Sequence, residues 1–209
     1  MGIGKTKFKN VIHSFDNGYI AVVDKSCSKQ EKLLAAQFSE RTVNLLHLGF
    51  AGLSVYPIID IGSWNEYKCE YGSPQRMHVF ILVLHNQIAG YLPIRWHRNI
   101  YQHDNLLDKD GKPFETKGEE LKVYTSDEFL KTTFDDEPKR LEGWGVEGIC
   151  VLPKYQRLGF GKLLVETAVH YLKANLRELA FDPPLTEAGE ALIKSLGLDI
   201  EEVRYTPGE

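Results

Sequence analysis

The sequence predicts an α/β fold in which short apolar strands are followed by amphipathic helices. A β-branched run at 18–23 is followed by apolar residues at helical spacing over 28–48. A hairpin pattern spans 77–94, and a strand, a tight loop and a helix follow one another over 146–172. A chain of 209 residues suits a single domain, which we expect to cover 1–209.

Composition and charge exclude several function classes. A net charge of -4 and a pI near 6.0 argue against binding nucleic acid or an anionic membrane, because both require a concentrated basic surface. No apolar run reaches the roughly 18 residues of a membrane span. The first residues lack the apolar core of a signal peptide, so we expect a flexible leader over 1–16 and a cytoplasmic protein. Cys27, Cys69 and Cys150 are too widely spaced for a zinc site, which predicts reduced thiols and no metal.

The first strand and helix are marked by their boundaries. The strand at 18–23 lies between Asn17 and Asp24. Ser28 and Glu31 have the spacing of a capping box, in which each side chain bonds a backbone N–H near the other. They predict the start of a helix that continues to about residue 48.

Two strong strands at 77–84 and 88–94 are separated by three polar residues, as in a β-hairpin. The first of them is apolar along almost its whole length. Such a run indicates a central strand with both faces covered.

The stretch 146–166 organises the rest of the chain. An apolar strand stops at Pro153, and Gly159 and Gly161 then open a helical pattern. A helix that begins near Leu158 would leave the amides of 157–162 as free first-turn donors, on which the helix dipole places a partial positive charge. The glycines carry no Cβ to keep a bulky anion away, and Arg157 and Lys162 add charge. These features predict a diphosphate site.

The pattern Gln156-x-x-Gly159-x-Gly161, after a strand that ends in Val151-Leu152-Pro153-x-Tyr155, resembles the acetyl-CoA pyrophosphate loop of the GNAT N-acetyltransferases. The glycine patterns of Rossmann and P-loop sites are absent. The resemblance implies a mixed, mainly antiparallel sheet of about six strands flanked by helices, with acetyl-CoA as co-substrate. The residues it assigns to acetyl-CoA are Ile149, Cys150, Val151, Gln156, Arg157, Leu158, Gly159, Phe160, Gly161 and Lys162.

The family's third and fourth strands are joined by a few residues, so 96–142 is expected to be a long insertion. Between His103 and Glu142 it holds twelve acidic residues and seven basic ones. Two interpretations remain open. The segment is a solvated flap, or it is an acidic lip that concentrates a cationic acceptor such as a lysine side chain or a polyamine.

The C-terminal part is expected to complete the sheet. Residues 176–181 predict a fifth strand, 186–196 a helix ended by Gly197, and 200–205 a sixth strand.

Two carboxylates are candidates for the general base of an acetyl transfer. Glu147 alternates with Ile149 and Val151 and is expected on the same strand face, although the family's glutamate commonly lies two residues upstream. Asp182 is the second candidate, because the last sixty or so residues resemble the MYST and type B histone acetyltransferases, and the catalytic glutamate of the MYST enzymes would fall on Asp182. Cys150 could instead form an acyl-enzyme, although a strand cysteine is more often a core residue.

The resemblance therefore implies an acetyl-CoA-dependent N-acetyltransferase that acts on a primary amine: a small amine, a polyamine, or a protein lysine or N-terminus. Direct attack assisted by a carboxylate base is the expected mechanism, in a monomer or homodimer. Two alternatives remain, a non-catalytic acyl-CoA-binding or sensor module and an acyltransferase for a longer acyl chain. The first is favoured by Ile193, which stands where many family members have a tyrosine.

Overall fold

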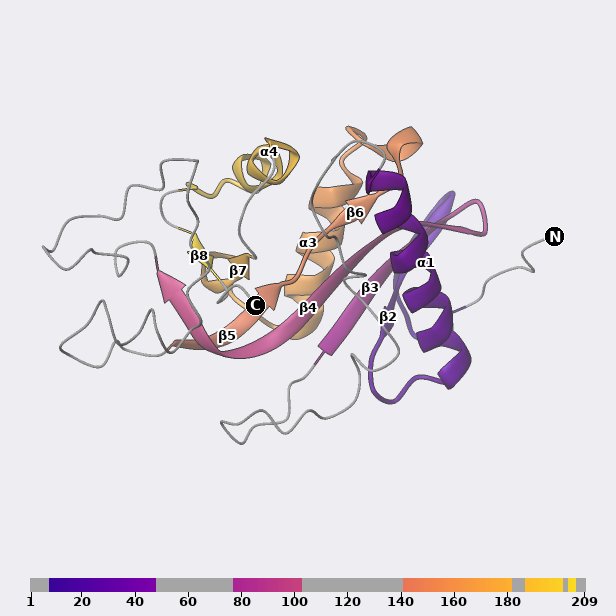
Figure 1. Ribbon diagram of the computed structural model, residues 1–209, viewed down its shortest axis with the longest axis horizontal. Coiled ribbons are helices and arrows are strands. Elements are labelled where there is room, and N and C mark those ends of the chain that lie inside the picture. Colours follow the sequence, from indigo (N-terminus) through magenta and orange to yellow (C-terminus); the bar gives the residue numbers. More distant parts are fainter. Residues whose placement is uncertain (1–7, 48–76, 103–140, 182–186, 201–202, 206–209) are drawn as a thin grey trace, which may run out of the picture. The chain divides into compact units, whose positions relative to one another are not determined.

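A computed structural model describes residues 8–47, 77–102, 141–181, 187–200 and 203–205. Along the chain, groups of strands are separated by helices (Figure 1). The strands are β1 (Val11–Phe15), β2 (Gly18–Val23), β3 (Met77–Leu84), β4 (Gln87–Gln102), β5 (Leu141–Val146), β6 (Cys150–Val151), β7 (Ala180–Phe181) and β8 (Arg204–Tyr205). The α-helices are α1 (Lys29–His47), α3 (Phe160–Leu172) and α4 (Glu187–Ser195), and short 3-10 turns are η3 (Pro153–Tyr155) and η4 (Leu176–Glu178).

The chain divides into two compact units. The first comprises residues 1–96 and 146–176, and the second comprises 97–145 and 177–209. The single domain over 1–209 remains a prediction.

Strand pairing is mainly antiparallel, as the family resemblance implied. In the first unit β1, β2, β3 and β4 pair in this order, and β6 pairs with β4. In the second unit the end of β4 pairs with β8 in antiparallel sense, and β7 pairs with β8 in parallel. The mixed α/β fold is therefore confirmed.

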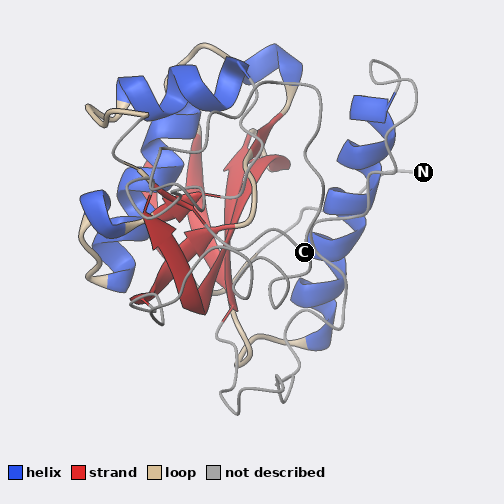
Figure 2. Ribbon diagram, turned by 60° about the vertical axis from the view of Figure 1, so that its left-hand side comes forward, coloured by secondary structure: helices blue, strands red, loops and turns tan. Residues whose placement is uncertain are grey.

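The core of the first unit lies on both faces of β3, as its apolar run predicted. Val79, Ile81 and Val83 join the cluster that includes Ala35 of α1. Phe80, on the opposite face, contacts the ring of Tyr171 of α3 at 5.7 Å between centroids. The two helices lie on opposite sides of these strands (Figure 2).

The capping box at the start of α1 is confirmed and extends to the N-terminal segment. Ser28 Oγ donates to Glu31 Oε2 at 2.6 Å, and the backbone N–H of Ser28 donates to the same oxygen at 3.1 Å. The backbone N–H of Lys9 donates to Glu31 Oε1 at 2.9 Å. Glu31 is buried, and its carboxylate joins residues 8–9 to the helix.

Strand β1 corrects the expectation of a flexible leader over 1–16. Val11–Phe15 pairs with β2 over the register from Val11↔Ala21 to Phe15↔Gly18. Gly18 is required there, because a Cβ would lie 2.1 Å from the carbonyl oxygen of Val83. Residues 1–7 lie outside the described part.

The expected insertion at 96–142 begins later and ends earlier than predicted. Strand β4 continues to Gln102, and β5 begins at Leu141. The acidic stretch between these strands lies outside the described residues.

We predict that Glu31→Gln destabilises the protein by about 1–2 kcal/mol at neutral pH, since it removes a charged cap. Burial alone would raise the pKa of Glu31, but hydrogen bonds from Ser28 and Lys9 outweigh it and lower the pKa below its ordinary 4.5. Because the pKa of Glu31 is lower in the folded protein than in the unfolded chain, its carboxylate stabilises the fold at pH values above the unfolded-state pKa. This stabilisation is lost as the pH falls through the folded-state pKa. Urea unfolding should therefore show a gap between wild type and variant that closes in acid.

Glu40→Gln is the matched control, because Glu40 is exposed on the same helix. Equal losses of stability in the two variants would contradict the stabilising role of Glu31 as a cap of α1.

Candidate functional site

Residues 156–162, which we call the phosphate loop, connect the end of β6 to the first turn of α3. The turn η3 follows the strand, and the exposed residues 156–159 lead to Phe160, where the helix begins. Helix α3 thus starts two residues later than the sequence predicted. Gly159 is its N-cap with a φ of 84°, a left-handed value that favours glycine.

The first turn of α3 presents its backbone N–H groups. The first bond of the helix runs from the N–H of Leu163 to the carbonyl of Gly159 at 3.0 Å. The N–H groups of Phe160 and Gly161 precede this bond, so they have no acceptor within the helix. No side chain caps this described helix end. A left-handed residue followed by helical ones makes a concavity of N–H groups that suits an anion, and the helix dipole adds to it.

Basic side chains surround the phosphate loop. Arg157 is exposed and has a φ of 62°, which is uncommon for a residue with a Cβ. Lys162 Nζ lies 3.7 Å from Glu166 Oε1, one helical turn later. Lys154 Nζ lies 4.6 Å from the centre of the Tyr155 ring. Arg157 is therefore the loop cation best placed to pair with an incoming anion, because Lys162 already has an acidic neighbour.

Gln156 does not extend away from the loop. Its side-chain Nε2 donates to the carbonyl of Val151 at 2.8 Å. This bond ties the phosphate loop to β6 and uses one of the two lone pairs of that carbonyl.

Strand β6 is held against β4 at very close range. Gly90 pairs with Val151, and Tyr91 pairs with Cys150. A Cβ on Gly90 would lie 2.7 Å from the carbonyl oxygen of Cys150. Glycine is thus required for β6 to adopt its present position.

The predicted strand at 146–151 is interrupted at residues 147–149. Pro93 of β4 explains the interruption, because proline has no N–H to donate to a neighbouring strand. The carbonyl of Pro93 still accepts from the N–H of Glu147 at 3.1 Å, and regular pairing resumes at Cys150. Ile149 therefore lies outside the regular strand.

Glu147 lies beside Arg95 rather than in a regular alternation with Val151. Glu147 Oε2 is 3.8 Å from Arg95 Nε, and both side chains are largely buried, with exposures of 18% and 15%. No sequence pattern indicates this arginine partner, since the pairing depends on how β4 and the interrupted strand meet. Asp182, the second candidate base, lies outside the described residues.

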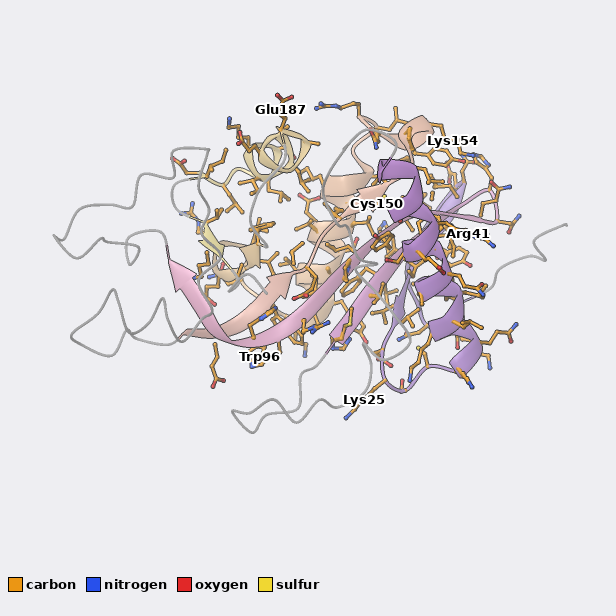
Figure 3. The ribbon with its side chains drawn as sticks, viewed as in Figure 1. Lys25, Arg41, Trp96, Cys150, Lys154 and Glu187 are labelled. Carbon is orange, nitrogen blue, oxygen red and sulfur yellow. The ribbon has the colours of Figure 1, made fainter. Side chains whose placement is uncertain are left out.

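Cys150 is a partly buried thiol beneath α1 (Figure 3). Burial raises its pKa, which a hydrogen bond with Thr42 opposes less strongly. Its cross-strand neighbour Tyr91 is fully buried, with its hydroxyl 3.4 Å from both Ser39 Oγ and Thr42 Oγ1. A thiol held in its neutral form is a poor nucleophile, so the surroundings of Cys150 favour a core role.

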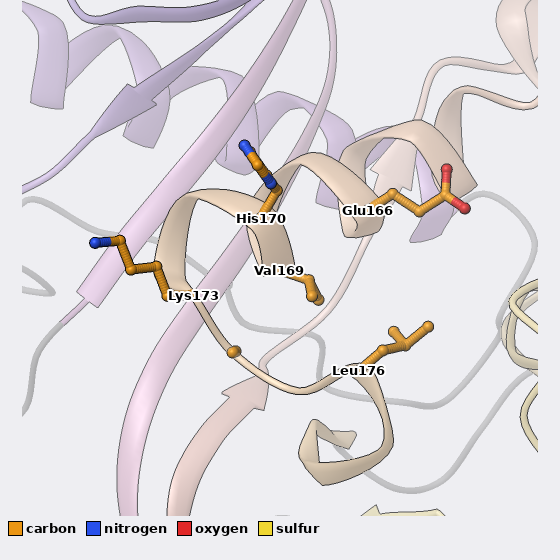
Figure 4. A pocket seen from close by; sticks show the side chains of 6 residues that line it. Glu166, Val169, His170, Lys173 and Leu176 are labelled. Atoms are coloured by element: carbon orange, nitrogen blue, oxygen red, sulfur yellow. The ribbon is translucent and has the colours of Figure 1, made fainter.

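A hollow of about 530 Å³ lies at the far end of α3 (Figure 4). Among its lining residues, Glu166, His170 and Lys173 point in different directions and do not converge on one centre. None of the candidate site residues lines it. No group of three or more potential metal ligands occurs among the described residues, and none of the described helices is long and apolar enough to cross a membrane.

The sequence profile of the family described as "Acetyltransferase (GNAT) family" matches residues 51–198. The chain is 26% identical, over 169 residues, to the histone acetyltransferase ESA1 of Saccharomyces cerevisiae. This alignment covers 73% of the chain and 37% of the relative, so the chain spans well under half of that protein.

Solved structures of the xEco2 acetyltransferase domain have a similar fold. One, bound to a CoA conjugate, matches with a TM-score of 0.55 and 16% identity, over 95% of this chain and 98% of the other. A second structure of the domain matches with a TM-score of 0.55 and 18% identity, over 96% and 97% of the two chains. At this identity the likeness concerns the fold alone.

We predict that Gly90→Ala destabilises the protein by about 1–3 kcal/mol, because the new Cβ must push back the backbone of β6. Urea unfolding measures the loss. Ala89→Gly, at the neighbouring buried position, removes a methyl group and adds none, so it controls for a general weakening of β4. An unchanged unfolding midpoint in Gly90→Ala would show that the approach of β6 is not tight.

Proposed function

The chain belongs to the GNAT acetyltransferase family, and we propose that it transfers an acetyl group from acetyl-CoA to a primary amine by direct attack. The observation that carries this proposal is the phosphate loop, where the N–H groups of Phe160 and Gly161 at the start of α3 precede the first helical bond. Such a cradle suits the diphosphate of CoA.

The residues proposed to hold the donor fall into two groups. Arg157, Gly159, Phe160, Gly161 and Lys162 would receive the diphosphate through their backbone and charges, with Leu158 as an exposed neighbour. Residues 149–151 would bond the pantetheine arm through their main chain, and a free N–H there would polarise the thioester carbonyl. Gln156, also predicted to contact the donor, is proposed to brace these two groups through its bond to Val151.

The transfer needs a base for the ammonium proton of the acceptor. Glu147 is the first candidate, because its largely buried carboxylate lies beside the interrupted strand, 3.8 Å from Arg95 Nε, and Asp182 is the second. The neutral amine then attacks the carbonyl carbon, the C–S bond breaks, and the CoA thiolate takes up a proton. Ile193, which is buried in α4, stands where the resemblance implies a tyrosine as proton donor. The thiolate would therefore leave without help from that position.

The acceptor is proposed to be a cationic amine. The acidic residues between His103 and Glu142 would raise the local concentration of such a substrate. The likeness to a protein named as a histone acetyltransferase favours a protein amine among the expected acceptors. A cytoplasmic location is part of the proposal, because three widely spaced cysteines do not form the disulfide framework typical of secreted proteins.

We predict that Glu147→Gln lowers kcat about 10²-fold or more, because the amide cannot accept the proton. Release of CoA thiol from acetyl-CoA, measured with a panel of amines, follows the rate. The KM for acetyl-CoA should change little, since the phosphate loop is intact. Glu40→Gln is the matched control, because Glu40 is an exposed carboxylate of α1 to which no part in the reaction is assigned.

An unchanged kcat in Glu147→Gln, combined with a large loss of kcat in Asp182→Asn, would identify Asp182 as the base. If CoA binds but no amine accelerates thiol release in the wild type, the chain is an acyl-CoA-binding module and the catalytic proposal is wrong.

We also predict that Cys150→Ala retains kcat within about threefold of wild type, because direct attack requires no acyl-enzyme. Since burial raises the pKa of Cys150, its alkylation by iodoacetamide at pH 8 should be slower than that of a solvent-exposed cysteine in a short peptide. Mass spectrometry of the intact protein after incubation with acetyl-CoA tests for an acyl-enzyme. An acetyl adduct on Cys150, together with loss of activity in the alanine variant, would replace direct attack by a two-step route.

A further inference from the structure

Three aromatic rings meet beside the phosphate loop. The Phe15 and Phe160 rings have centroids 6.2 Å apart and are tilted by 31°. The Tyr155 and Phe160 rings have centroids 6.4 Å apart and are nearly perpendicular, at 87°. Both distances fall within the range in which aromatic pairs attract each other. Phe160 is thus held from two sides.

These contacts fall at the two ends of the exposed part of the phosphate loop. Tyr155 is the last residue of η3, and Phe160 is the first residue of α3. The residues between them are exposed, and the side chain of Leu158 is 64% accessible to solvent. The left-handed φ of Arg157 is unfavourable for a residue with a Cβ. Packing at the ends must therefore hold a loop that its own side chains do not bury.

Phe15 lies at the end of β1, where backbone hydrogen bonds join two turns. It pairs with Gly18 across the turn between β1 and β2. The N–H of His85, in the turn between β3 and β4, donates to the carbonyl of Asn17 at 2.9 Å. This bond links the two turns, and Phe15 lies at the end of β1 beside them.

A hollow of about 410 Å³ lies between these turns and the phosphate loop. Phe15, Leu84, Tyr155, Leu158 and Phe160 are among its lining residues. Loss of the Phe15 ring would enlarge this hollow and leave Phe160 with room to turn into it. The N–H groups of Phe160 and its neighbours would then no longer be held in one arrangement.

We propose that Phe15 is a positioning residue for the donor site, which acts through the Phe160 ring to hold the first turn of α3 in the geometry that receives the diphosphate of CoA. The inference rests on the proposed function. It assigns a role in donor binding to β1, a strand far from the phosphate loop in the sequence.

The test compares Phe15→Ala with wild type by isothermal titration calorimetry of CoA. The affinity should fall about tenfold, the order of magnitude expected when an aromatic contact that fixes a binding loop is lost. The KM for acetyl-CoA should rise by a similar factor while kcat stays within about twofold. With S-acetylpantetheine, which has no diphosphate, the rate should be unchanged by the substitution. Phe15→Leu, which keeps apolar bulk, should recover part of the affinity.

Val11→Ala is the matched control, because Val11 is an exposed apolar residue of the same strand, 43% accessible, and is absent from the three-ring contact. Thermal melting of each variant reports folding, and Phe15→Leu carries the comparison if the alanine variant does not fold. Equal CoA affinity in Phe15→Ala, or equal losses in Val11→Ala, would overturn the positioning role. Equal losses with both donors would overturn it too. Absence of CoA binding in the wild type would instead overturn the proposed function itself, and the positioning role with it.

Discussion

The candidate site depends on the burial of β3 and β4 between α1 and α3. Val79, Ile81 and Val83 pack toward α1, and Phe80 packs toward α3. Because both faces of these strands are covered, their register cannot slip by one residue without exposing apolar side chains. Helix α3 also contacts β1 and β6. The position of its N-terminus, and with it the phosphate loop, follows from this packing.

Within that frame, backbone groups do most of the anion binding that we propose. The N–H groups of Phe160 and Gly161 are oriented by the start of a helix, so they need no reorganisation when an anion arrives. Side-chain charge is secondary, since Lys162 has Glu166 as a neighbour and Arg157 is exposed to solvent. Such a site tolerates many side chains but depends on glycine at position 159, where φ is 84°.

Features encoded by neighbouring residues could be predicted from the sequence. The capping box of Ser28 and Glu31, the hairpin after β3 and the loop–helix junction near Gly159 are of this kind. Strand β1 could not, because Val11, His13 and Ser14 are all exposed at the edge of the sheet and give no apolar alternation. The interruption at 147–149 depends on Pro93, and the partner of Glu147 is Arg95; both lie more than fifty residues upstream. Only the register of β4 brings them to the site.

The two parts of the proposed donor site, the phosphate loop and strand β6, are joined by specific contacts. Gln156 joins the phosphate loop to the carbonyl of Val151, and Gly90 lets β6 lie close against β4. The strand proposed to hold the thioester and the loop proposed to hold the diphosphate are therefore parts of one braced structure. A shift of the loop would be transmitted through Gln156 to the strand beside Glu147. Since a misplacement of about 1 Å at the reacting atoms can cost 10²-fold in rate, this brace links the binding of the donor to the alignment of its carbonyl.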